Sequence, residues 1–434
     1  MTHAPPPVLS ETTAALCVLL ILLVPLAAAG LSLINAGLGR SRSAAHAMLS
    51  SLCVLAVAVL VYFFCGFSWE GFAGGPAHVV TVAGKAWNWI SAEPFFLRGL
   101  PPEGSPASLS ALLEMFSVGL AALIPLGAGT DRWRLGAACA STALLAGCTY
   151  PIFAHWAWGG GWLAQLGVNR GLGRGYLDAG GAGCIQVVGG LTAWTIACIL
   201  GPRRGKYAMD GAPAAIPGHN AVLVLLGCFL ALVGWFGLNC AGSILFAGAA
   251  PGAVAGVAID TVLAAAMAAL AAAAITRTRF GRPDASLCAN GWVAGLVASS
   301  AACAFMTPAA AALTGLVAGA LVTFSVEWLD IRLGVDDPAG SISVHAVSGI
   351  WGVLALGIFA RIPGDSGQFV AQLAGVATLL GFVLPLTYFL NWSLNRFYPQ
   401  RVAAEGERQG MDLYELGAGA YPEFVIHRED LTQG

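Results

Sequence analysis

The sequence predicts an all-α fold, a polytopic membrane protein with eleven transmembrane helices. Hydrophobic residues make up 58% of its 434 residues and charged residues 10%, whereas soluble domains carry about 25% charged residues. Eleven apolar runs follow one another along the chain, and most approach the roughly 20 residues that a helix needs to cross a bilayer. The mean hydropathy of +0.78 excludes an ordinary soluble domain.

The first apolar run, at about 14–36, is expected to be retained as a span. The residues before it contain no Lys or Arg, and the run is too long for a signal peptide. The split between the eighth and ninth runs, at Thr307-Pro308, is the least distinct boundary. The other ten runs lie at about 46–67, 106–127, 135–157, 182–201, 219–239, 252–275, 287–305, 308–327, 342–360 and 370–394.

Two of the loops are long. Segment 68–105 contains several Trp residues and is expected to lie along the membrane interface, with its rings at headgroup depth. Segment 159–181 is rich in Gly and is expected to form an irregular outer loop. A single transmembrane domain is therefore predicted over 1–394, followed by a tail at 395–434.

The distribution of basic residues predicts the orientation. With the N-terminus outside, most of the 20 Lys and Arg residues fall in the cytoplasmic loops and in the tail, as the positive-inside rule requires. We therefore expect an integral protein of the cell (inner) membrane, with its N-terminus outside and its C-terminus in the cytoplasm. The net charge of −2 gives no electrostatic case for binding nucleic acid.

Two segments in different halves of the chain match each other. Asp178 is followed eight residues later by Gln186, and Asp337 is followed eight residues later by His345. Each acid lies where a polar loop meets an apolar run. Eight residues of helix rise about 12 Å, toward the middle of a hydrocarbon core about 30 Å thick. Polar side chains at that depth are costly and indicate a functional site.

This match predicts an inverted repeat. Spans 1–5 and 6–10 form two halves, at about 14–201 and 219–360, and an odd number of spans in each half gives the halves opposite orientations. Gln186 and His345 can then meet near the middle of the bilayer. The eleventh helix stands outside the repeat.

The two deep polar side chains have competing interpretations. Either could simply hold two helices together through a hydrogen bond. In a pore, a neutral imidazole both donates and accepts a hydrogen bond and can move a proton near neutral pH, whereas an amide cannot accept a proton. Such a pore suits a small polar or protonatable solute. It does not suit a large anion, because no basic residue lies at similar depth.

Other polar and aromatic residues lie nearer the membrane surfaces. Trp158 ends the fourth run and could anchor the interface or present its face to a cation at an outer vestibule. Asp178 could cap a helix, add a negative field for cations, or do both, and Asp337 is assigned the same structural or electrostatic role. Ser243, beyond the sixth run, could accept a hydrogen bond from a cation that loses its water.

Several motifs, in matching order and spacing over about 14–421, resemble one known family. They are Trp158-Gly159-Gly160-Gly161, Gly234-Trp235-Phe236-Gly237-Leu238-Asn239-Cys240-Ala241-Gly242-Ser243, Val335-Asp336-Asp337-Pro338, Val344-His345 with Gly349, and the tail segments Gly410-Met411-Asp412 and Ala420-Tyr421. Together they resemble the ammonium transporter (Amt/Mep/Rh) family.

The resemblance implies eleven spans, a homotrimer and one narrow apolar pore in each subunit. It implies that ammonium is recruited outside by Trp158 and Ser243, with Asp178 at the outer end of the fifth span. Two stacked pore histidines then handle the solute, and His345 matches the second of them. Bacterial members are also gated by a PII signalling protein, so a PII-type regulator at the tail is a candidate partner.

The sequence departs from the family at the pore. Counting from the acid at the start of span 5 gives Gln186 in place of the first pore histidine, or Ile185 if one residue is skipped. Leu238 stands where the family has an outer gating Phe. The other gating Phe is matched by Phe116, although a count without a gap gives Ser117.

Further departures lie outside the pore. One extra residue precedes Ser243, and about eight extra residues lie between Trp158 and the acid of span 5. The family's HGE motif in the tail is Leu416-Gly417-Ala418 here, and Gly340 replaces an Asp that usually follows the DDP motif. The last two differences weaken the case for coupling to a PII protein.

The expected function is transmembrane transport of ammonium/ammonia, in which ammonium is recruited outside, deprotonated and passed as ammonia. The alternatives are a sensor that binds ammonium and conducts weakly or not at all, and a neutral gas channel of the Rh type. An enzyme is not expected, because apart from His345 no nucleophile–base pair or carboxylate pair is evident at pore depth. No cofactor is expected, and the 11 Cys residues show no paired spacing that would indicate a metal site or a disulfide framework.

Overall fold

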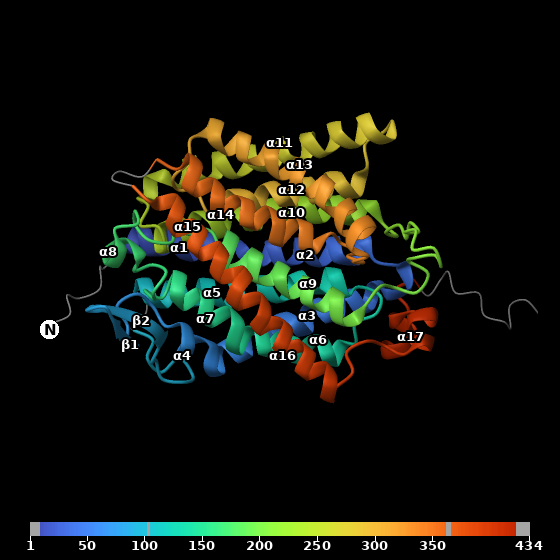
Figure 1. Cartoon of the computed structure of the whole chain (residues 1–434), viewed down its shortest axis with the longest axis horizontal. Helices are drawn as coiled ribbons and strands as arrows, with labels where there is room; N and C mark the ends of the chain where they lie inside the picture. The colour runs from blue at the N-terminus through green and yellow to red at the C-terminus, as the bar shows by residue number, and fades with distance from the viewer. Residues whose placement is uncertain (1–8, 102–104, 362–365, 422–434) are drawn as a thin grey trace, which may run out of the picture.

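The fold is a bundle of long apolar helices (Figure 1). The computed structural model describes residues 9–101, 105–361 and 366–421. Over these residues, ten helical segments are long and apolar enough to cross a membrane, whereas the sequence predicts eleven.

Five of these segments lie in the N-terminal half of the chain. They are Glu11–Leu38, with α1 (Glu11–Ile21) and α2 (Val24–Leu38); Ser41–Glu70, with η1 (Ser41–Ser43), α3 (Ala44–Val61), η2 (Tyr62–Gly66) and α4 (Phe67–Glu70); α5 (Pro106–Gly129); Leu135–Ala157, with α6 (Leu135–Leu144), η3 (Leu145–Thr149) and α7 (Tyr150–Ala157); and Ala182–Leu200, with η4 (Ala182–Val187) and α9 (Val188–Leu200).

The other five lie in the C-terminal half. They are α10 (Ala221–Leu245); Pro251–Phe280, with η5 (Pro251–Ala253) and α11 (Val254–Phe280); α13 (Pro308–Leu333); Ile342–Phe359, with η6 (Ile342–Val347) and α14 (Ser348–Phe359); and Gln368–Phe397, with α15 (Gln368–Thr378), η7 (Leu379–Val383) and α16 (Leu384–Phe397).

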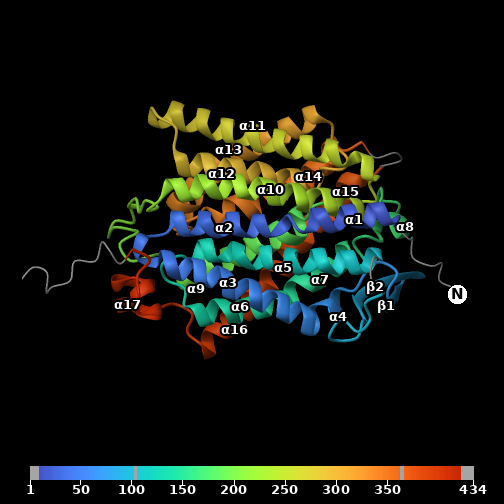
Figure 2. The ribbon, with the colours of Figure 1, turned by 180° about the vertical axis from the view of Figure 1, so that it is seen from behind.

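The eighth predicted run forms a shorter helix, α12 (Ala285–Ser300). It has 16 residues, fewer than the roughly 20 that cross a bilayer without help from neighbours, which accounts for the difference in the count. It lies between α10 and α13 in both views of the bundle (Figures 1 and 2). It also approaches α11 closely, since a Cβ on Gly295 would lie 2.4 Å from the carbonyl oxygen of Ala264. Glycine permits this contact, as in many membrane helix pairs.

The all-α prediction misses a β-hairpin. β1 (Ala77–Val82) pairs antiparallel with β2 (Lys85–Ser91). The turn between them, Ala83-Gly84, takes positive φ values of 51° and 73°, which match the twist of a two-residue hairpin. The hairpin and the short helix α8 (Leu166–Arg170) lie at one end of the bundle, which we call the hairpin end (Figures 1 and 2).

The hairpin ties the two long loops together. The backbone N–H of Asn88 donates to the side-chain oxygen of Gln165 over 2.8 Å, and the side-chain amide of Asn88 donates to the carbonyl oxygen of Gly160 over 3.2 Å. These hydrogen bonds fix segment 159–181 against segment 68–105. The segment was predicted to be irregular, but it contains the short helix α8.

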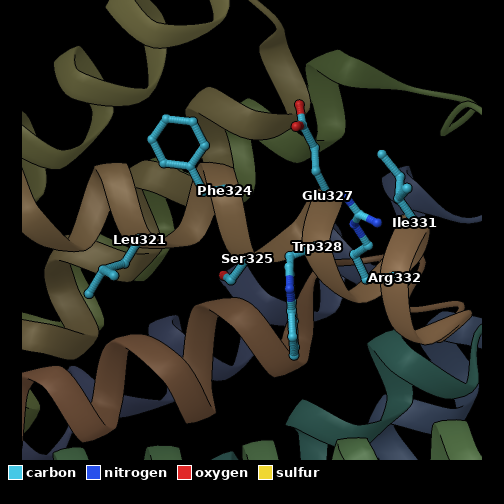
Figure 3. Close-up of a pocket in the computed structure, with 7 residues that line it drawn as sticks. All are labelled: Leu321, Phe324, Ser325, Glu327, Trp328, Ile331 and Arg332. Atoms are coloured by element: carbon cyan, nitrogen blue, oxygen red, sulfur yellow. The ribbon is translucent and has the colours of Figure 1, made fainter.

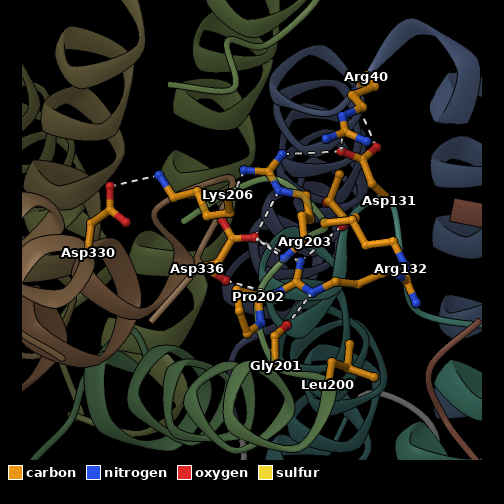
Figure 4. Close-up of polar contacts among 12 residues, drawn as sticks. Arg40, Asp131, Arg132, Leu200, Gly201, Pro202, Arg203, Lys206, Asp330 and Asp336 are labelled. Carbon is orange, nitrogen blue, oxygen red and sulfur yellow. Dashed lines mark hydrogen bonds and ion pairs between the residues drawn. The ribbon is translucent and has the colours of Figure 1, made fainter. Parts of the chain in front are cut away.

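A buried ionic cluster holds the opposite end of the bundle, which we call the tail end (Figure 4). Arg132 donates to the carbonyl oxygens of Gly201, after α9, and of Asp336, before η6, both over 2.8 Å. Arg203 binds both carboxylate oxygens of Asp336, over 2.9 and 3.0 Å, and reaches Asp131 over 3.2 Å. The cluster therefore ties the end of one polar-tipped helix to the start of the other.

The described part of the tail packs on this same end. It contains α17 (Ala404–Gln409) and η8 (Asp412–Leu416). Asp412 accepts hydrogen bonds from the backbone N–H groups of Ala45 and His46, over 3.2 and 2.7 Å, at the start of α3. Glu415 accepts from the N–H of Leu135 over 2.9 Å, at the start of α6. Carboxylates stabilise helix N-termini, so the tail is held by the ends of two spans.

Candidate functional site

Two π-helical segments carry the polar side chains that the sequence predicts at depth. η4 leads into α9, and η6 leads into α14. π-helical turns are rare and occur often at functional sites. Each follows an acid and, three residues later, a glycine with positive φ: Asp178 and Gly181 (85°), and Asp337 and Gly340 (69°). Only glycine adopts such a backbone readily, and it lets the chain turn from the loop into the helix.

Asp178 caps its helix with both carboxylate oxygens. Oδ1 accepts from the N–H groups of Gly181 and Ala182, over 3.0 and 2.7 Å. Oδ2 accepts from those of Gly183 and Cys184, over 2.8 and 2.9 Å. A helix start leaves four N–H groups without intrahelical partners, and one buried side chain binds four N–H groups here.

Asp337 makes a simpler cap at the start of η6. Its Oδ2 accepts from the N–H of Ile342 over 2.7 Å, and its backbone oxygen accepts from Gly340 over 3.0 Å. Its Oδ1 has no hydrogen-bond partner within the described chain. The two acids therefore occupy corresponding positions, but among the described residues the carboxylate of Asp178 accepts four hydrogen bonds and that of Asp337 accepts one.

The two segments enter from opposite ends and cross closely. η4 begins at the hairpin end, and η6 begins at the tail end beside the cluster of Figure 4. A Cβ on Gly190 of α9 would lie 2.3 Å from the backbone nitrogen of Ala346 in η6. A Cβ on Gly349 of α14 would lie 2.7 Å from the side chain of Val187 in η4. The absence of side chains at these glycines brings the two segments into contact.

Gln186 and His345 meet at this crossing. The Nδ1 atom of His345 lies 2.7 Å from Oε1 of Gln186, and the two residues are 4% and 0% exposed. Because an amide oxygen can only accept, Nδ1 carries the hydrogen and Nε2 keeps its lone pair. The amide nitrogen of Gln186 is buried without a hydrogen-bond partner among the described residues. The pair therefore offers one acceptor and one unused donor group.

The free groups of this pair complement a solute that both donates and accepts hydrogen bonds. A small neutral molecule can take a hydrogen bond from the amide of Gln186 and give one to Nε2 of His345. A cation has no lone pair to offer the amide, and it would also lose its water in an apolar interior, at a cost of several kcal/mol. The crossing is thus suited to a neutral species.

A cavity of about 230 Å³ opens at the hairpin end. Trp158 and Phe246 line it, with their rings stacked 4.3 Å apart at an angle of 9°. The indole N–H of Trp158 donates to the carbonyl oxygen of Asp178 over 2.7 Å. The cavity therefore presents an aromatic surface that can attract a cation, and its Trp158 is held by the backbone of the residue that caps η4. Sequence analysis missed Phe246, which follows α10 directly and matches no motif.

Three other predicted site residues lie apart from this cavity. Ser243 is buried, and its hydroxyl donates to the carbonyl oxygen of Cys240 in α10 over 2.8 Å. Leu238 is buried in the same helix. Phe116 lines a separate apolar groove beside α2 and α3. The residues recorded around the hairpin-end cavity include Trp158 but none of these three.

Two buried acids in the cavity were also missed. Glu70 and Glu114 both line it, and each is 2% exposed. Glu114 lies inside the apolar run 106–127, and an acid inside a span is itself a signal of function. The prediction that no carboxylate pair lies at depth did not take Glu114 into account.

A second cavity, of about 160 Å³, lies at the tail end. Asp337 and Ser343 line it together with Arg203 and Lys206 of the neighbouring loop. One cavity therefore lies at the hairpin end, where η4 begins, and the other lies at the tail end, where η6 begins. The Gln186–His345 pair lies between the two segments.

A larger groove, of about 530 Å³, lies elsewhere on the molecule. It follows the side of α13 and contains none of the residues discussed above (Figure 3). Its lining residues are Leu321, Phe324, Ser325, Glu327, Trp328, Ile331 and Arg332. Size alone therefore does not identify the functional site, whereas the buried polar groups do.

Comparison with known proteins identifies the family. The model of the Ammonium Transporter Family matches residues 15–421. The ammonium transporter Amt2 of Archaeoglobus fulgidus is 36% identical, covering 93% of this chain and 86% of its own length. An ammonium transporter of Bacillus subtilis is 30% identical, covering 93% and 96%.

Solved structures show the same fold. The structure of a "Sensor Amt Protein" superposes with a TM-score of 0.83 at 29% identity, covering 93% of this chain and 97% of that one. Candida albicans Mep2 superposes with a TM-score of 0.78 at 23% identity, covering 95% and 90%. The family model spans nearly the whole chain, and these likenesses agree with it. The chain belongs to the ammonium transporter family.

Proposed function

We propose that the protein moves ammonium across the membrane by recruiting the ion at the hairpin end and passing it onward as ammonia. The contact between Gln186 and His345, 2.7 Å long and buried between two cavities, carries this proposal. It leaves one donor, the amide nitrogen of Gln186, and one acceptor, Nε2 of His345, and ammonia can both accept and donate a hydrogen bond. Family membership supports ammonium as the substrate.

Recruitment and deprotonation follow from the electrostatics. The face of Trp158 attracts the cation, and the nearby carboxylate of Asp178 adds a negative field. Ammonium stripped of water in an apolar passage costs several kcal/mol, so losing a proton is the cheaper route. Because the amide of Gln186 does not titrate, this proton passes to water or to His345, and a current requires that it crosses by the same carriers. Potassium has no proton to lose and would have to enter the passage at the full cost of desolvation. Ser243, Phe116 and Leu238 remain candidates for recruitment and gating through the family resemblance alone.

The architecture we propose has eleven spans, with α12 as the eighth. Two inverted halves, at about 14–201 and 219–360, would then place η4 and η6 at equivalent positions, and their shared acid–glycine–polar pattern supports this. The hairpin end would face outward and the tail end inward, where most basic residues lie. The homotrimer implied by the family resemblance completes the proposal.

The role of Gln186 can be tested directly in proteoliposomes. We expect wild type to give ammonium-evoked current that is slower or less selective over potassium than that of Gln186→His, because His adds a second titrating ring beside His345. Solid-supported-membrane recordings with ammonium and potassium measure both properties. Gln409→His, an exposed change in the tail, is the control. Identical rates and selectivities in wild type and Gln186→His would contradict a limiting role for this amide.

A sensor is the second candidate, favoured by the likeness to the "Sensor Amt Protein" at 29% identity. In this case ammonium binds at the hairpin end without net passage. Isothermal titration that shows binding, together with proteoliposomes that show no flux, would support the sensor over the transporter. Flux without current would instead indicate a neutral gas channel of the Rh type.

A PII-type regulator is a proposed partner at the tail end. The tail docks through Asp412 and Glu415 on the starts of α3 and α6, so a protein that binds there could reach two spans at once. The sequence departures at Leu416-Gly417-Ala418 and Gly340 weigh against it. Size-exclusion chromatography with a purified PII protein, with and without its nucleotide ligands, tests the interaction.

A further inference from the structure

Two carboxyl groups share the hairpin-end cavity. Glu70 is the last residue of α4, and Glu114 lies in the first half of α5. Both line the cavity beside Trp158 and Phe246. The two groups are close enough to interact electrostatically. The proposed recruitment by Trp158 and Asp178 does not use either of them.

The carboxyl groups have unused hydrogen-bonding capacity. The hydroxyl of Tyr150 donates to Oε2 of Glu114. Oε1 of Glu114 and Oε2 of Glu70 are buried and have no hydrogen-bond partner in the described chain. Buried carboxyl oxygens without donors are costly. Two such oxygens in one cavity point to a ligand that supplies N–H or O–H groups.

No positive side chain compensates these acids. Among the described residues that line the cavity, none is Lys, Arg or His. The titratable groups around the two carboxyls are Tyr62, Tyr150 and Asp178, and His155, whose Nδ1 contacts the backbone oxygen of Glu70 over 2.6 Å. None of them holds a permanent positive charge.

The charge state of the pair follows from this environment. Adjacent carboxylates repel each other, so two ionised groups cannot persist side by side in a buried site. A single buried carboxylate without a counter-charge is also costly. Without a bound cation the pair would therefore retain protons, and a cation that enters must displace one of them to gain a negative partner.

We propose that Glu70 and Glu114, beside the ring of Trp158, form a cation-binding site that exchanges a bound proton for an ammonium ion. In this exchange a carboxyl O–H bond breaks and its proton passes to water. The carboxylate oxygen then accepts an N–H from ammonium, and the charge of the site is unchanged. Ammonium supplies donors for both unused oxygens, whereas potassium supplies none. The identity of the cation rests on the proposed function.

Binding to the full-length protein in detergent tests the site without transport. Ammonium chloride is titrated into weakly buffered protein with a pH indicator, and infrared difference spectra record the carboxylic-acid carbonyl band. We expect wild type to release protons in proportion to the ammonium bound and to lose carbonyl-band intensity. Potassium chloride should produce neither change.

Single substitutions assign the site to its residues. Glu114→Gln and Glu70→Gln should each raise the dissociation constant for ammonium roughly tenfold or more, because a charge-assisted bond is lost, and should reduce the proton release. Glu93→Gln is the matched control, because Glu93 is a buried acid at the hairpin end that does not line the cavity. Its affinity and proton release should equal those of wild type.

The outcomes separate this site from the pore. Size-exclusion profiles show whether each variant folds. If Glu114→Gln does not fold, the infrared and proton-release measurements on wild type decide whether the cation site exists. Wild-type binding without proton release overturns the site, as does unchanged affinity in both folded variants. Binding with proton release but no flux in proteoliposomes would refute the proposed transport and leave the site intact.

Discussion

At the scale of single residues, the amide of Gln186 differs from an imidazole in having a fixed hydrogen-bonding direction. An imidazole can exchange the roles of its two nitrogens, but the amide of Gln186 keeps its oxygen as acceptor and its nitrogen as donor. The contact with His345 at 2.7 Å uses only the oxygen. A passage with one imidazole and one amide therefore orients a solute more rigidly than one with two imidazoles.

Asp178 gives a prediction at the same scale. In Asp178→Asn, one oxygen becomes an NH₂ group that faces the N–H groups of two backbone residues. We expect a loss of about 3 kcal/mol of stability, because bonds to a buried charged group are removed. Thermal unfolding in detergent measures it. Asp210→Asn, in an exposed loop, should change little, and equal melting temperatures for the two variants would contradict this account of the cap.

At the scale of elements, the glycines at the crossing set how closely the two π-helical segments approach. A Cβ on Gly190 would lie 2.3 Å from the backbone of Ala346, so Gly190→Ala must push α9 away from η6. We expect a loss of about 1–3 kcal/mol from overpacking, and slower ammonium flux because Gln186 and His345 separate.

The control for this prediction is another helical glycine. A Cβ on Gly256 in α11 would meet nothing within 4 Å, so Gly256→Ala should keep wild-type flux and stability or gain slightly from helix propensity. Melting temperatures and flux in proteoliposomes compare the two variants. Wild-type behaviour of Gly190→Ala would show that the crossing tolerates a larger separation.

At the scale of the whole molecule, the tail-end cluster joins elements that are far apart in sequence. Burial lowers the pKa of Arg132 to about 10. Burial alone would raise the pKa of Asp336, but Arg203 and Arg132 hold it below its ordinary value. The cluster therefore stays ionised at neutral pH and connects α5, α9 and η6 through one carboxylate (Figure 4).

Asp336 predicts a pH dependence of stability. The pKa of Asp336 is lower in the folded protein than in the unfolded chain. Its contribution to the free energy of unfolding is therefore complete above its ordinary pKa of about 3.9, and this contribution is lost as the pH falls through the lower pKa of the folded protein. Asp336→Asn should therefore lower the melting temperature by an equal amount throughout pH 5–8. The difference should narrow below about pH 4. A difference that already narrows at pH 6 would contradict this assignment.

The sequence predicted the spans and the deep pair better than it predicted the cavity. Apolar runs and the eight-residue spacing from each acid depend on local patterns, and the spacing singled out Gln186 and His345, whose side chains lie 2.7 Å apart. The stacking of Phe246 on Trp158 depends on how α10 ends against α7, which no local pattern encodes. The hairpin was missed because a short exposed strand pair lacks a buried face. The run at 287–305 was predicted, but its helix α12 is shorter than expected, because tight packing lets a shorter helix fit.

One helical segment, which includes the π-helical stretch η2, runs from the tail end of the molecule to the hairpin end. The segment Ser41–Glu70 has 30 residues, so it measures about 45 Å. Near its first turn, backbone groups of Ala45 and His46 are held by Asp412 of the tail. The last residue of the segment is Glu70, which lines the cavity at the hairpin end. A change in the contact between the tail and the start of α3 therefore acts on the same helical segment that ends at Glu70, the acid proposed above to bind a cation.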